Sequence, residues 1–240
     1  MLTEKIIYKD EDVLLEASVA YPKKAPSPLV IVCHAWNGRD AFVEEAVLRI
    51  SEWGFIGFAL DVYGKGILGR SKEENVRLKQ PFLADRRRLQ QRLREGLELA
   101  CSLGKADTSK IAVMGFGFGG LCALDLARSE TALNGVISFY GHFEEAPAVR
   151  NQDIQSKVLL LHGADDPIVP MQDLLVFSKN LTQNGVDWQA QIFGKTLHAF
   201  MNPSIQDPLA GVAYNARSAN RAWVAASQFL KNDVFACEKN

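Results

Sequence analysis

The sequence predicts an α/β fold in which a mostly parallel central sheet is covered by helices on both faces. Short apolar runs alternate with helix-like patterns along the whole chain. The run from Leu29 to Cys33 (LVIVC) is apolar without interruption, as in a strand buried on both faces. Near the middle, a glycine cluster at 115–120 joins such a run directly to a helical pattern. With 240 residues, 48% of them hydrophobic, the chain can bury a full core, and we expect one domain spanning residues 1–240.

The first predicted elements are two extended segments, Ile6 to Tyr8 and Leu14 to Tyr21. Such segments commonly add antiparallel edge strands to a parallel sheet. A proline-rich break separates them from the buried strand at Leu29 to Cys33. Asp40 is then placed to cap a helix with apolar residues on one face, and Gly54 is placed to end it.

The later elements follow the same alternation. We expect a strand at Phe55 to Leu60, a glycine-spaced loop at 61–69 and one long helix from Leu83 to Leu103. The basic part of that helix (86–94) is interleaved with leucines, which is typical of an amphipathic helix with one solvated face. The remaining predicted strands are Ile111–Met114, Gly135–Tyr140, Val158–His162 and Trp188–Phe193, and the remaining helices include Leu121–Ala127, Met171–Asn184 and Tyr214–Leu230.

Charge and composition argue against several classes of function. A formal net charge of -1 and a pI near 6.4 provide no basic surface for nucleic acid. No apolar run approaches the roughly 18 residues of a membrane span, and the N-terminus resembles neither a signal nor a transit peptide. The four cysteines include no C-x-x-C pair. We therefore expect a cytoplasmic protein, a monomer or homodimer, with reduced thiols and with no metal, cofactor, nucleic-acid or membrane partner.

The glycine cluster has the form of a strand, a sharp turn and a helix. In the G-x-S-x-G or G-x-C-x-G turn of α/β-hydrolases, the middle residue is a nucleophile lifted above the sheet. Here Gly115 and Gly119 occupy the outer positions and Gly117 occupies the middle one. The turn therefore matches the pattern of a nucleophilic hydrolase, except that the attacking side chain is missing.

The same glycines allow a second interpretation. Gly115, Gly117 and Gly120 also spell G-x-G-x-x-G, the dinucleotide-binding pattern with its phosphate site at a helix N-terminus. That pattern calls for an acidic residue about 20 positions later, at the end of the next strand. The expected strand ends at Tyr140, and the nearest carboxylate is Glu144. Close packing of helix on strand is a third, purely structural reason for the glycines.

Four loops with chemically useful residues begin where predicted strands stop. They carry Trp36, Gly117, Asp166 and His198, and parallel strands bring such loops to one edge of the sheet. The order nucleophile position, acid, histidine is that of α/β-hydrolases. His198 would be the general base and Asp166 would orient it, because the following proline restricts Asp166 to an extended or turn conformation. Asp165 is the competitor for that role.

The other histidines and the aromatic residues have less specific patterns. His34 and His162 lie at strand ends and are expected to pack or to hold loops, and His142 is a weaker base candidate because it follows the wrong strand. Tyr140 and Phe200 are the favoured wall residues of an apolar substrate pocket. The wider set of aromatic candidates is Trp36, Phe116, Phe118, Phe139, Tyr140 and Phe200.

Five segments together resemble the dienelactone hydrolases over nearly the whole chain. They are CHAWNGRD, GFALDVYGKG, GFGFGG, HGADDPIVP and HAF. The resemblance implies an α/β-hydrolase fold and a Cys-His-Asp triad whose members fall at Gly117, His198 and Asp166. It also implies an oxyanion hole formed by the backbone N–H groups of Trp36 and Phe118.

Two positions depart from the family pattern. The resting-state Glu in the loop after the first buried strand is replaced by Ala35, and the nucleophile is replaced by Gly117. We therefore predict a hydrolase of small carboxylic esters or lactones that is inactive or strongly impaired. The glycine can reflect a laboratory change or error at a cysteine, a natural loss that leaves a ligand-binding pseudoenzyme, or direct use of water with His198 as base. Dinucleotide binding through Gly115 to Gly120 is the less favoured alternative.

Overall fold

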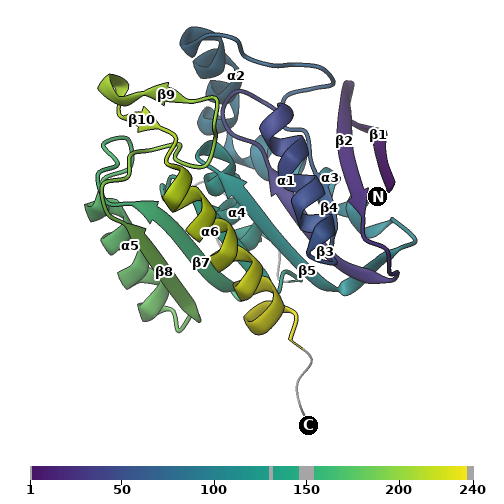
Figure 1. Ribbon diagram of the computed structural model, residues 1–240. Coiled ribbons are helices and arrows are strands. Elements are labelled where there is room, and N and C mark those ends of the chain that lie inside the picture. The colour runs from purple at the N-terminus through teal and green to yellow at the C-terminus, as the bar shows by residue number, and fades with distance from the viewer. Residues whose placement is uncertain (1, 130–131, 146–153, 237–240) are drawn as a thin grey trace.

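The computed structural model describes residues 2–129, 132–145 and 154–236 and contains one eight-stranded sheet (Figure 1). The strand order is β1-β2-β4-β3-β5-β6-β7-β8. β1 and β2 pair antiparallel, β2 pairs antiparallel with β4, and the other neighbours are parallel. The bounds are β1 Leu2–Asp10, β2 Val13–Tyr21, β3 Ser27–Cys33, β4 Ile56–Ala59, β5 Ala106–Phe116, β6 Gly135–Phe139, β7 Lys157–Gly163 and β8 Trp188–Phe193.

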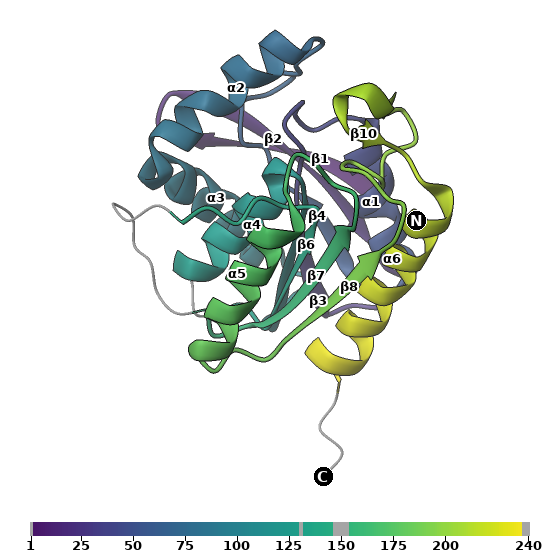
Figure 2. The ribbon, with the colours of Figure 1, turned by 90° about the vertical axis from the view of Figure 1, so that its left-hand side faces the viewer.

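Helices cover both faces of this sheet, which confirms the predicted fold class. Figure 2 shows α3, α4 and α5 on one side and α1 and α6 on the other. Alternate residues of the buried strands serve the two layers: Leu29 and Ile31 of β3 join the core with α3, α4 and α5, while Val30 joins the core with α1 and α6. The helices are α1 Ala41–Glu52, α3 Arg86–Cys101, α4 Phe118–Ser129, α5 Met171–Gln183 and α6 Ala216–Gln228, which continues as a π-helical turn at Phe229–Val234.

The predicted helix from Leu83 to Leu103 corresponds to α3, which runs from Arg86 to Cys101, but the sequence did not predict the separate helix that precedes it. α2 (Lys72–Ala84) ends at Asp85, whose carboxylate accepts hydrogen bonds from the N–H groups of Arg87 and Arg88 and so caps α3. α2 also begins with a usable signal, since the hydroxyl of Ser71 accepts a hydrogen bond from the N–H of Glu74. Its weak apolar periodicity explains why the helix was missed: Asn75 and Phe82 are its buried residues.

The prediction that the basic segment forms a solvated face fails for two arginines. Arg86 is buried and makes two hydrogen bonds of 2.6 Å to the carboxylate of Asp125. Arg92 is also buried, where it pairs with Asp10 and donates to the carbonyl of Val62 at 2.7 Å. A buried ion pair is tolerated only when its remaining donors are satisfied, as they are through such contacts. The arginine spacing did not show which members of the segment had buried carboxylate partners.

A short hairpin follows the last long strand. It comprises β9 (Gln206–Asp207), a 3-10 turn at Pro208–Ala210 and β10 (Val212–Ala213), none of which the sequence predicted. Both ribbon views place this hairpin and α2 at the same end of the sheet (Figures 1 and 2). Within the part of the chain that the structure describes, no helix is long and apolar enough to cross a membrane.

Candidate active site

The glycine turn between β5 and α4 places residue 117 at the sheet edge with a left-handed backbone, φ +56°. Its neighbours are glycine for steric reasons: a Cβ at Gly119 would lie 2.2 Å from the carbonyl oxygen of Cys33, and one at Gly115 would lie 1.9 Å from that of Gly119. At Gly117 the nearest atom to an added Cβ would be 3.5 Å away, which is ordinary contact. Position 117 thus has room for a side chain, whereas positions 115 and 119 have none.

The atom that an added Cβ at Gly117 would face is Nε2 of His198, at 3.5 Å. The ring of Tyr140 follows at 3.6 and 3.7 Å. A serine oxygen or cysteine sulfur stands one bond beyond Cβ, so at this separation the nitrogen is within its reach. The vector from residue 117 therefore points to the imidazole that the sequence assigned as base.

Asp166 and His198 form a dyad whose geometry is held by three hydrogen bonds. Nδ1 of His198 lies 2.8 Å from Oδ2 of Asp166, whose side chain has no exposed surface. The other oxygen, Oδ1, accepts from the N–H groups of Ile168 and Val169 at 2.9 Å each. Asp165, the competitor, is exposed. An imidazole held this way donates from Nδ1 and leaves Nε2 free to accept a proton.

The backbone of His198 is anchored by the β9–β10 hairpin. Its N–H donates to the carbonyl of Gly211 and its carbonyl accepts from the N–H of Ala213, both at 3.1 Å. The next residue, Ala199, has a left-handed φ of +58°. These contacts orient the loop that carries the imidazole. They could not be predicted without the hairpin, which the sequence did not indicate.

Tyr140, which follows β6, lines the cavity, and Phe200 packs against its ring on the side away from the cavity. Tyr140 has a left-handed φ of +41°, a strained conformation for a non-glycine residue, and its ring packs edge-on against His198 and Phe200. Burial raises the pKa of the Tyr140 hydroxyl, so the residue stays neutral. The prediction that Phe200 lines the pocket is corrected: it is fully buried and touches Tyr140 and Phe193 instead.

The resemblance to dienelactone hydrolases implies oxyanion donors at the backbone N–H groups of Phe118 and Trp36. Phe118 is the first residue of α4, so its N–H has no partner within the helix and sits at the positive end of the helix dipole. Trp36 lies in the loop after β3, where its carbonyl accepts from the hydroxyl of Tyr63 at 2.9 Å. Both residues line the same cavity as Gly117 and His198.

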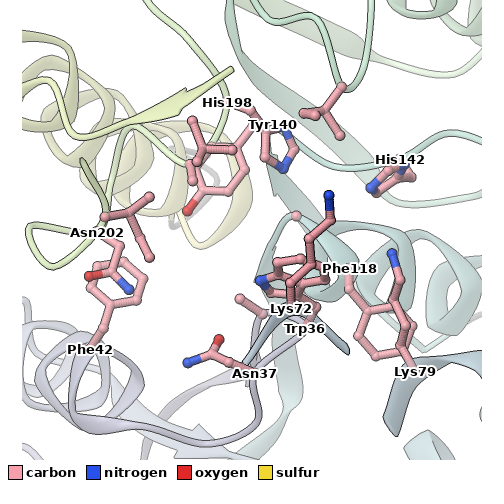
Figure 3. Close-up of a pocket in the computed structure, with 16 residues that line it drawn as sticks. Trp36, Asn37, Phe42, Lys72, Lys79, Phe118, Tyr140, His142, His198 and Asn202 are labelled. Atoms are coloured by element: carbon pink, nitrogen blue, oxygen red, sulfur yellow. The ribbon is translucent and has the colours of Figure 1, made fainter. Parts of the chain in front are cut away.

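This cavity has a volume of about 230 Å³ and mostly apolar walls. Figure 3 shows His198, Tyr140 and His142 around it, with Lys72 and Lys79 reaching in from α2. The Lys79 ammonium lies 5.3 Å from the centre of the Trp36 ring, and burial lowers its pKa. The lining residues are Ala35, Trp36, Asn37, Phe42, Lys72, Lys79, Gly117, Phe118, Tyr140, His142, Ile168, His198, Ala199, Asn202, Ile205 and Val212.

A model of the dienelactone hydrolase family matches residues 15–234. The chain belongs to this family. It is 24% identical over 233 residues to a putative carboxymethylenebutenolidase of Aquifex aeolicus, covering 95% of this chain and 97% of the relative. It is 24% identical over 245 residues to the carboxymethylenebutenolidase of Pseudomonas putida, covering 96% and 100%. A dienelactone hydrolase-like promiscuous phosphotriesterase from metagenomic libraries superposes with a TM-score of 0.90 at 28% identity, covering 95% and 97%.

Family membership and local packing together favour the elbow interpretation of the glycines over dinucleotide binding. An added Cβ at Gly120 would lie 2.6 Å from Cα of Gly141, so this third glycine is needed where α4 meets the residues after β6. β6 ends at Phe139 and is followed by the buried Tyr140, a position where a ribose-binding acid would be expected. Among the described residues, no group of three or more His, Cys, Asp or Glu could hold a metal ion.

The two positions at which this chain departs from the dienelactone hydrolase pattern, Ala35 and Gly117, both lie at the cavity. Ala35 lines the cavity with a methyl group, and Gly117 contributes only backbone. His34 and His162 hold loops as predicted: His34 donates to the carbonyl of Ala35 and accepts from the N–H of Val62, and His162 lies 2.9 Å from the carbonyl of Val169. Burial lowers the pKa of both imidazoles.

Sequence reasoning missed two charged cavity residues, Lys72 and Lys79, and named a third cavity residue, His142, only as a weaker base candidate. His142 was given a minor role because it follows β6, although the parallel sheet puts that strand end beside β5. Lys72 and Lys79 were missed because α2 itself was missed. A capping signal at Ser71, followed by lysines spaced seven apart, would have placed both lysines two helical turns apart on one face of the helix.

Proposed function

We propose that this chain carries the acid–base and oxyanion-binding groups of a hydrolase for small carboxylic esters or lactones, and that Gly117 leaves its own turnover strongly impaired. The observation that carries the proposal is the direction of an added Cβ at Gly117, which meets Nε2 of His198 at 3.5 Å. A packing glycine has no reason to face the free nitrogen of a carboxylate-held imidazole.

In the proposed mechanism, His198 removes a proton from the attacking oxygen or sulfur, and Asp166 stabilises the imidazolium that forms. The N–H groups of Phe118 and Trp36 hold the oxyanion of the tetrahedral adduct. Loss of the nucleophile in such a triad typically costs on the order of 10⁶-fold in turnover, and the remaining rate comes from the oxyanion hole and substrate binding.

The cavity supports a small substrate with an anionic group. A volume of about 230 Å³ suits a short acyl or lactone unit. The relatives named carboxymethylenebutenolidase have, by that name, a butenolide with a carboxymethylene group as substrate. Lys72 and Lys79 provide positive charge in the cavity, so we propose that this chain also favours esters or lactones that carry a carboxylate.

The test is to supply the missing nucleophile. Gly117→Ser and Gly117→Cys are expected to release p-nitrophenol from p-nitrophenyl butyrate at least ~100-fold faster than the parent, since even a poorly placed nucleophile restores part of the ~10⁶-fold deficit. His198→Ala in the same background is expected to abolish the gain. Gly104→Ser is the matched control, because an added Cβ there meets no atom within 4 Å.

A ligand-binding pseudoenzyme predicts a different result. No gain in either Gly117 variant, together with saturable binding of small carboxylic esters to the parent by calorimetry, would replace the hydrolase proposal with that alternative. Saturable binding of NAD or FAD would instead favour the dinucleotide interpretation of the glycines.

A further inference from the structure

A second imidazole faces the same cavity as the dyad. His142 lies three residues after the end of β6, and its ring centre is 6.0 Å from that of His198 (Figure 3). Its side chain is 23% exposed, so it can exchange protons with solvent. Nδ1 of His142 lies 3.7 Å from Oε1 of Glu144, close enough for the carboxylate to stabilise the imidazolium.

Glycine at position 117 leaves room for water beside His198. A water in the place of the nucleophile's side chain could donate a hydrogen bond to Nε2 of His198, which Asp166 holds in position. Nε2 would then take the proton of this water. Both rings line the same cavity and their centres are 6.0 Å apart, so one substrate bound in the cavity can contact both imidazoles. The cavity therefore has two proton-transfer groups near one reacting centre.

We propose that His142 is a catalytic acid in the parent protein: His198 deprotonates a water that attacks the substrate directly, and His142 protonates the oxygen that leaves. This inference rests on the proposed hydrolase function and extends it by assigning the slow reaction of the Gly117 chain to two histidines rather than to one.

The proton and bond changes balance without any further reactant. The water oxygen bonds to the acyl carbon while one of its protons passes to Nε2 of His198. When the adduct collapses, the bond from the acyl carbon to the leaving oxygen breaks, and that oxygen takes a proton from the His142 imidazolium. The products are a carboxylic acid and an alcohol. A proton then passes through solvent from His198 to His142, which restores both groups.

A serine at position 117 would reduce the demand on His142. In a serine-based reaction, His198 takes the hydroxyl proton and returns it to the leaving group, so one imidazole performs both transfers. The contribution of His142 should accordingly depend on which residue occupies position 117. A merely structural role of His142 would produce the same loss in both backgrounds.

The first experiment compares His142→Gln with the parent on ethyl butyrate and p-nitrophenyl butyrate, which share one acyl group. Ethoxide needs a proton to leave, whereas p-nitrophenolate does not. We expect kcat/KM to fall about 100-fold for the ethyl ester, as is typical when a general acid is removed, and by less than about fivefold for the p-nitrophenyl ester. Equal losses on the two esters would overturn the proposal. The His198→Ala protein, purified in parallel, measures contaminating esterase activity.

The second experiment repeats His142→Gln in the Gly117→Ser background. We expect the loss on the ethyl ester to shrink from about 100-fold to less than about tenfold. A loss of the same size in both backgrounds overturns the proposal, and so does a parent no faster than His198→Ala on either ester. If Gly117→Ser is active while the parent is not, the hydrolase proposal survives and this one fails; if neither is active, the hydrolase proposal itself fails.

Discussion

Gly117→Ala tests whether the site is arranged around a side chain at residue 117. Alanine in a left-handed backbone costs about 1–2 kcal/mol, and the smaller conformational freedom of the unfolded chain returns about 0.4–1 kcal/mol. The added Cβ meets its nearest neighbour at 3.5 Å, so no steric cost is expected. The free energy of unfolding should therefore fall by only about 1 kcal/mol.

Two other glycines serve as matched controls for this prediction. Gly185 has a φ of +69° with no atom within 4 Å of an added Cβ, so Gly185→Ala should show the same backbone cost of about 1 kcal/mol. Gly119→Ala would place Cβ 2.2 Å from the carbonyl oxygen of Cys33 and should cost more than about 4 kcal/mol or prevent folding.

The assay is urea unfolding followed by far-ultraviolet circular dichroism. The three variants should rank as Gly117→Ala close to Gly185→Ala, with Gly119→Ala far below both. A loss at Gly117→Ala that exceeds the Gly185→Ala loss by more than about 2 kcal/mol would refute the reasoning, because His198 and Tyr140 would then be packed against a glycine rather than around a missing side chain.

The remaining predictions concern catalysis in the Gly117→Ser background. Asp166→Asn should lower kcat on the order of 10⁴-fold. The single carbonyl oxygen of the asparagine would keep the hydrogen bonds from the N–H groups of Ile168 and Val169, so its NH₂ group would donate to Nδ1 of His198. The imidazole would then carry its proton on Nε2, which could no longer act as the base. The matched change at the exposed neighbour, Asp165→Asn, should alter kcat less than about twofold, and equal losses would contradict the assignment. Lys79→Met should raise KM about fivefold for p-nitrophenyl hydrogen glutarate, an ion-pair effect discounted for a half-exposed lysine, while KM for the neutral butyrate ester should change little. The same KM shift for both esters would exclude a charge-based role.

Much of the fold followed from local patterns. The unbroken apolar run of β3 and the alternation of strands with helices correctly indicated a parallel sheet covered on both faces, since these patterns depend on which residues must avoid water. The strand ends also indicated where loops would gather. α2 was not predicted, because its residues show little apolar periodicity and only Asn75 and Phe82 are buried.

The site was predicted as far as chain order and motifs allow. The loops with Asp166 and His198 were expected at one edge, and the structure places the two side chains 2.8 Å apart. Phe200 was wrongly expected to line the cavity, because the sequence does not say which aromatic residue faces the cavity and which lies behind it. That choice depends on the backbone conformation at strand ends, such as the left-handed φ of Tyr140.

By itself, the sequence determined the order of elements, the resemblance to dienelactone hydrolases and the absence of a nucleophile at Gly117, because each is recorded in neighbouring residues. Only the tertiary structure decided that an added side chain at Gly117 would face His198, that Arg86 and Arg92 are buried, and that His142 and Lys79 share the cavity. These relations join residues far apart in the chain. A periodic pattern reveals which face of an element is buried, but the partner across that face is set by packing in three dimensions.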